Sequence, residues 1–169
     1  MDIRAALLKE HSKGQTMKIV DHIGSDPERF RDLMDCFLGD SYRLSQRAAW
    51  AVTYCAEKDG DLIKPYLKRL IEQLERHDAH PAIRRNVART LQFIEIPERY
   101  RGRVFDACYR LVEDIKQPVA VRVFAMTVAA QIAANEKVLL DELRLVASKH
   151  QDRMSAGFKS RFRRLFGPI

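Results

Sequence analysis

Apolar and small residues recur along this chain with the spacing of one face of an α-helix. The pattern is clearest after Pro81, where such residues fall at offsets 0, 4, 5, 8 and 11, as expected for a helical period of about 3.6. These positions are Ile83, Val87, Ala88, Leu91 and Ile94. Proline suits the first turn of a helix, where no backbone N–H is needed. We therefore predict a helix that begins at Pro81 and buries one face.

The same pattern occurs once earlier and once later at nearly constant spacing, and a truncated copy precedes both. The three sets are Leu44, Ala48, Ala49, Val52 and Cys55; Val121, Ala125, Met126, Ala129 and Ile132; and Thr16, Met17, Val20 and Ile23. A second apolar stripe follows each of these helices, at Phe30 to Leu38, Ile63 to Ile71, Val104 to Val112 and Leu139 to Val146. Self-similarity with a period of about 40 residues and no strand pattern predicts an array of helix pairs, each burying its apolar face against its neighbours.

The boundaries of the pairs follow from turn residues. One helix can end at Gly24, and the next can be capped by Asp26 and begin at Pro27. We predict pairs at about residues 12–39, 41–77, 80–115 and 117–152, a short helix at 2–10 and a final amphipathic helix at 155–166. Pro65 lies about one turn inside the helix predicted for residues 61–77, so that helix should start later or bend.

The stretch from Pro81 to Leu91, with its proline, branched apolar residue, arginine and small residues, resembles the first helix of a HEAT repeat. The resemblance extends over about residues 12–152. It implies an all-α, right-handed α-α superhelix of about four helix pairs with a C-terminal capping helix, in one domain spanning residues 1–169. The pattern's proline and arginine are replaced by Ser41 and Ser45 in the second copy, so a ladder of stacked arginines would be interrupted there.

Two short runs, Arg47 to Trp50 and Ser155 to Phe158, are similar to small bacterial HEAT-like proteins. Such proteins sometimes carry an adenylosuccinate lyase label. This chain has neither the serine-bearing loop nor the long bundle of such a lyase, and we expect no lyase activity. Its resemblance to HEAT arrays favours a non-enzymatic module that binds another protein.

Composition fits a globular helical protein, with 46% apolar residues, 7 Gly and 6 Pro. No run approaches the roughly 20 apolar residues of a membrane span, and the first residues lack a signal-peptide pattern, so we predict a cytoplasmic protein. Its three cysteines, Cys36, Cys55 and Cys108, lack metal-ligand spacing and suit reduced packing residues. No glycine-rich phosphate loop occurs. We therefore expect no cofactor, no metal and no catalytic residues.

The net charge of +7 is concentrated at one end, where residues 143–169 carry 7 Lys and Arg against 1 Asp. The last helix interleaves basic residues with phenylalanines, a combination that can hold a polyanion and stack its bases. The basic residues are Lys159, Arg161, Arg163 and Arg164, and the phenylalanines are Phe158, Phe162 and Phe166. The reading we favour is simpler: the rings face the core and the arginines solubilise a capping helix.

A second basic cluster lies in the third pair, on the helix that the resemblance places on a concave surface. Its members are Arg99, Arg101, Arg103 and Arg110. They can hold phosphates or an acidic partner. The alternative, which we favour, is pairing with nearby carboxylates along the same helix.

An aromatic pair and a histidine pair are further candidates for a binding site. Trp50 and Tyr54 lie four residues apart and can contact a partner, although packing against the incomplete first repeat is the simpler interpretation. A distant resemblance to HEAT-like glycosylases of alkylated DNA would assign Trp50 to an extruded base, but no matching catalytic Asp is found. His77 and His80 lack a third ligand, which argues against zinc. A protein partner is thus our leading hypothesis, and nucleic acid is the alternative.

Overall fold

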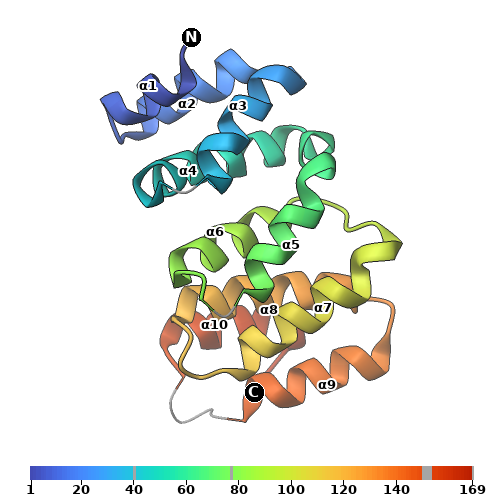
Figure 1. Cartoon of the computed structure of the whole chain (residues 1–169). Coiled ribbons are helices and arrows are strands. Elements are labelled where there is room, and N and C mark those ends of the chain that lie inside the picture. Colours follow the sequence, from blue (N-terminus) through green and yellow to red (C-terminus); the bar gives the residue numbers. More distant parts are fainter. Residues whose placement is uncertain (40, 77, 150–153, 169) are drawn as a thin grey trace. The chain divides into compact units, whose positions relative to one another are not determined.

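In a computed structural model the chain is all-α, as predicted, and no strand occurs within residues 1–39, 41–76, 78–149 and 154–168, which the structure describes. The elements are α1 (Ile3–Lys9), α2 (Lys13–Ile23), α3 (Pro27–Leu38), α4 (Tyr42–Lys58), η1 (Gly60–Tyr66), α5 (Leu67–Glu75), α6 (Pro81–Leu91), α7 (Glu98–Glu113), α8 (Val119–Ile132), α9 (Lys137–Ser148) and α10 (Ala156–Phe166) (Figure 1). The chain divides into two compact units, residues 1–72 with 93–95 and residues 73–92 with 96–169, and each is described by itself.

In the first unit, α3 packs on α4, α2 contacts both, and α1 covers all three. The core is formed by side chains of the predicted stripes, including Phe30, Met34 and Val52, which are fully buried. The turn after α2 follows the predicted chemistry. Gly24 has φ 53, and the Asp26 side chain accepts hydrogen bonds from two backbone N–H groups of α3, which satisfies donors that a helix start leaves free.

The chain after α4 departs from a regular helix because of Pro65. Residues Gly60–Tyr66 form a 3₁₀ helix that contains this proline, and the α-helix begins only at Leu67. Proline lacks the N–H that an α-helical turn would use, so the helix predicted for residues 61–77 starts later, as anticipated. His77, at its predicted end, lies outside the described residues.

The second unit is built from two rows of helices. The first helices α6 and α8 contact each other, and α10 packs against α8 in the place of a further first helix. The second helices α7 and α9 form the other row, and both contact α8. Helix pairs within this unit therefore pack in series. Phe158 and Phe162 of α10 are 1% exposed, so α10 is anchored by its phenylalanines.

Helix α6 is buried on more than the single face predicted from its apolar residues. Ile83 is only half-buried, whereas Arg84 is buried and donates a hydrogen bond to the backbone O of Arg76. The equivalent residue of the next helix pair, Arg122, is also buried and donates from Nε to the O of Val112 at 2.9 Å. Both guanidinium groups donate to carbonyls at or just after the end of a preceding second helix, where the helix itself supplies no donor.

Candidate functional site

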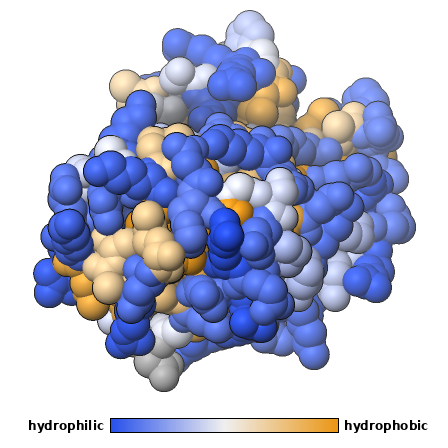
Figure 2. Space-filling view, turned by 90° about the horizontal axis from the view of Figure 1, so that it is seen from above, coloured by the Kyte–Doolittle hydropathy of each residue, from blue (hydrophilic) through white to orange (hydrophobic). Residues whose placement is uncertain are grey.

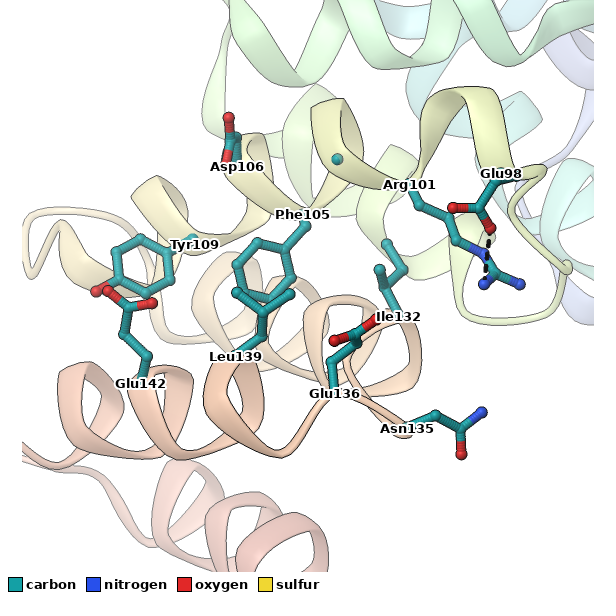
Figure 3. A pocket seen from close by; sticks show the side chains of 11 residues that line it. Glu98, Arg101, Phe105, Asp106, Tyr109, Ile132, Asn135, Glu136, Leu139 and Glu142 are labelled. Carbon is teal, nitrogen blue, oxygen red and sulfur yellow. Dashed lines mark ion pairs between the residues drawn. The ribbon is translucent and has the colours of Figure 1, made fainter.

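A groove of about 440 Å³ lies in the second unit between α7 and α9 (Figure 3). Its walls combine apolar and acidic side chains. The residues that determine its character are Phe105, Tyr109, Ile132, Glu136, Leu139 and Glu142. A concave site with an apolar floor and a few polar groups at its edges is typical of ligand-binding sites in proteins.

The floor of the groove is aromatic and aliphatic. Phe105 and Tyr109 lie one turn apart on α7 with ring centroids 6.0 Å from each other, and Leu139 of α9 points across the groove toward Phe105 (Figure 3). The packing of α7 and α9 against α8 holds these side chains in place. Phe105 is 7% exposed, so half-buried Tyr109 and Leu139 supply most of the floor that an apolar group could cover and remove from water.

Carboxylates flank this floor. Glu136 and Glu142 are exposed, their side chains point toward α7 (Figure 3), and neither makes an ion pair with another described residue. On the α7 side, Glu98 is paired with Arg101 at 3.0 Å. The pKa of Tyr109 is raised, first by burial and then by the negative charges of Glu142 and Glu113. The groove thus carries a negative potential that its own residues do not neutralise.

The outer edge of α9 adds apolar surface. Val138 and Leu145 are 79% and 66% exposed, the largest exposed fractions among the large apolar side chains of the described residues. They lie four residues before and three residues after Glu142, which puts all three on one face of α9. The outer face of α9 beside the groove therefore carries exposed apolar side chains, with Glu142 between them and Leu139.

Gly102 leaves part of the α7 wall open. A Cβ atom built at this helical position meets no atom within 4 Å. The first atom of a side chain introduced there would therefore enter open space at the groove.

The predicted arginines of α7 lie mostly in ion pairs and hydrogen bonds. Arg103 contacts Glu75 through two hydrogen bonds of 2.6 and 2.5 Å, and Arg101 is paired with Glu98. The guanidinium of Arg99 lies 4.9 Å from the ring centroid of Tyr100, and Arg110 is exposed. Arg101 lines the groove, whereas Arg103 pairs with the carboxylate of another element.

The basic residues of α10 divide into two kinds. Arg161 is half-buried and donates to Gln92 at 3.1 Å and to Thr127 at 2.5 Å, whereas Arg163 and Arg164 are exposed and Lys159 is half-buried. Phe166 packs against Phe162 with ring centroids 5.0 Å apart. Helices α7 and α10 share α8 as a neighbour, and their described residues make no substantial contact with each other. The structure therefore does not bring the two arginine clusters together.

Trp50 lies in the first unit and is 39% exposed. Its ring is 5.3 Å from that of His11, at an interplanar angle of 36°, and Tyr54 is half-buried one turn further along α4. The tryptophan therefore packs on the segment between α1 and α2 and keeps part of one face open to solvent.

The remaining chemical candidates have structural roles in the described residues. His80 accepts a hydrogen bond from the backbone N–H of Ala82 at the start of α6, while His77 lies outside the described residues. Burial raises the pKa of both Cys55 and Cys108 to about 12. No group of three His, Cys, Asp or Glu side chains within the described ranges is placed to hold a metal ion.

The groove was missed by reasoning from sequence. Its acidic residues are separated along the chain and do not form a visible charge run. The available signal was a valine and a leucine of α9, Val138 and Leu145, which fall outside the stripe predicted at Leu139, Leu143 and Val146.

No described helix has both the length and the apolar character needed to cross a membrane. Comparisons with curated proteins and with solved structures found no match. The family described as HEAT repeat domain matches residues 3–169, almost the entire chain. The repeated helix pairs, the buried arginines at equivalent positions and this match agree, and the chain belongs to the HEAT repeat domain family.

Proposed function

We propose that this chain is a non-enzymatic protein-binding module whose main contact surface is the groove between α7 and α9. The observation that carries the proposal is the open groove with an apolar floor, beside which the outer face of α9 exposes Val138 and Leu145. Contiguous exposed apolar surface bordered by polar residues is typical of protein contact sites. HEAT repeats generally serve as scaffolds for protein interactions, which supports the same reading.

One face of the molecule can be compared with the groove by its hydropathy. Figure 2 shows a face on which hydrophilic residues predominate and apolar residues gather in separate patches. The exposed part of Trp50 is a second apolar feature, but it lies on the first unit and its ring packs against that of His11. The groove is therefore the better candidate for a stable contact.

A nucleic-acid interface on α10 has less support. The rings of Phe158 and Phe162 are buried and cannot stack on bases, and Arg161 is held by Gln92 and Thr127. Exposed Arg163 and Arg164 remain as the cationic pair of this helix.

Site-specific cross-linking tests the proposal. A photoreactive amino acid at Val138 should capture a partner in cells, and the same group at Arg163 on α10 serves as the matched control position. The captured protein, once purified, should bind the wild-type chain with defined stoichiometry and should bind the Gly102→Phe variant at least about tenfold more weakly. A partner captured equally from both positions, or one whose affinity is unchanged by Gly102→Phe, would contradict the proposed surface.

A further inference from the structure

The charge pattern of the groove identifies the kind of segment that fits it. Along α9, Leu139 lies midway between Glu136 and Glu142, so an apolar side chain is flanked by a carboxylate on each side. Six residues of α-helix rise about 9 Å. The backbones of Glu142 and of Glu136, the N-cap residue of α9, are thus separated by somewhat less than the length of four residues in an extended peptide, a difference that lysine side chains can bridge.

The opposite wall matches this arrangement. Phe105 faces Leu139 across the groove, and Tyr109 lies near the carboxylate of Glu142 (Figure 3). Arg101 is the basic residue of this wall, and Glu98 already neutralises it. The site therefore offers an apolar centre between two anionic ends.

From this geometry, and resting on the proposed function, we infer that the groove binds a basic peptide segment of a partner protein. An apolar side chain of the segment seats between Phe105 and Leu139, and a lysine or arginine on either side meets Glu136 and Glu142. Burial of the apolar side chain, the anchor of the segment, contributes binding free energy because its surface leaves water. The charge pairs determine the register and orientation of the segment and the rate at which it associates.

The same charges exclude other occupants. A phosphate backbone or an acidic peptide would meet Glu136 and Glu142, whose charges no described residue pairs, and like charges at close range oppose binding. An uncharged apolar segment could bury its side chains on the floor of the groove, but it would leave the two carboxylates without partners. Binding should therefore need both the apolar anchor and the basic flanks.

Fluorescence anisotropy with the purified full chain tests the inference. The probe is a short dye-labelled peptide in which a leucine has a lysine two positions before it and another two positions after it, so that the three side chains share one face of an extended segment. Its affinity should fall about tenfold or more when the leucine becomes alanine or the lysines become glutamates, and it should weaken as salt increases.

Variants of the chain locate the binding site. Glu142→Lys should lower the affinity for the lysine peptide about tenfold and raise the affinity for the peptide in which glutamates replace the lysines. Glu57→Lys makes the same charge change at an exposed position of α4 in the first unit and should leave both affinities within about twofold. Gly102→Phe should block the groove. Gly157→Phe, at an exposed helical glycine of α10 whose added Cβ also meets no atom within 4 Å, should not.

Absence of binding, or equal binding of the lysine and glutamate peptides, overturns the inference. So does an equal effect of Glu142→Lys and Glu57→Lys. The proposed function can survive these negative peptide results. It does so if cross-linking from Val138 captures a partner whose affinity falls in the Gly102→Phe variant, because that partner would then bind through a segment of different chemistry. Failure of the cross-linking experiment removes the proposed function itself.

Discussion

Arg122 lies over the ring of Phe158, with its guanidinium carbon 4.6 Å from the ring centroid, and so joins α8 to α10. The same side chain donates from Nε to the backbone O of Val112 in the last turn of α7. One buried arginine thus contacts three helices of the second unit. Burial lowers its pKa from the usual value, but an arginine stays protonated at neutral pH.

Replacing this arginine should destabilise the second unit. Arg122→Met keeps much of the apolar stem but removes the donor to Val112 and the cation over Phe158, at an expected loss of about 2 kcal/mol. Hydrogen exchange of the α8 and α10 amides measures the effect. Arg163→Met, at an exposed position of α10, is the control and should change stability by less than about 0.5 kcal/mol. Similar losses in the two variants would show that the buried contacts contribute little.

Ser45 occupies the position in the second helix pair that is equivalent to Arg84 in the third. Its hydroxyl is buried and has no hydrogen-bond partner in the described part of the chain. Ser45→Ala removes this unsatisfied group and favours the helix, so the first unit should unfold at a higher urea concentration, with a gain of up to about 1 kcal/mol. Trp50 fluorescence reports this unit. A loss of stability would mean that the hydroxyl does have a stabilising contact.

The helix pairs could be predicted because their information is local and repeated. Ala88 and Val87 are fully buried, as the stripe of α6 required, and Gly24 and Asp26 end and start helices as their types favour. The buried state of Arg84 was harder to anticipate, because a charged residue is read as exposed until a partner such as the carbonyl of Arg76 is known.

The groove also escaped prediction, but for a different reason. Phe105 and Leu139 belong to different helix pairs and are far apart in the sequence, and each sits on a stripe that reads as ordinary core. Their meeting at an open site depends on how α7 and α9 pack on α8. The conspicuous signal in the sequence was the basic end, where Phe158 and Phe162 proved to be buried and Arg161 engaged.

The ion pair between Glu75 and Arg103 should make stability depend on pH. Hydrogen bonding to Arg103 lowers the pKa of Glu75 below the usual 4.5. A lowered folded-state pKa means that the contribution is complete above 4.5 and is lost as pH falls through the folded-state value. Both side chains are partly exposed, so the contribution is about 0.5 kcal/mol. Glu75→Gln should therefore be less stable than wild type at neutral pH, and the difference should shrink as the pH falls below 4.5. Thermal unfolding over a series of pH values measures this, and a constant difference would contradict the role of the ion pair.

The cysteines should react only when the chain opens. Cys55 and Cys108 are buried, and burial raises the pKa of each thiol to about 12, so little thiolate forms at mildly basic pH. We expect iodoacetamide to modify neither residue in the native protein and to modify both in denaturant, as read by mass spectrometry. Rapid native alkylation of Cys108 would show that its part of the core is open to solvent.

The most direct measurement of the binding claim is a chemical-shift map of the isotopically labelled chain titrated with the lysine and leucine peptide. We predict that the largest changes fall on α7 and α9, above all at Phe105, Tyr109 and Leu139. The amides of α10 and of Trp50 should change little. Changes confined to α10 or to the surroundings of Trp50, with α7 and α9 unaffected, would contradict the account.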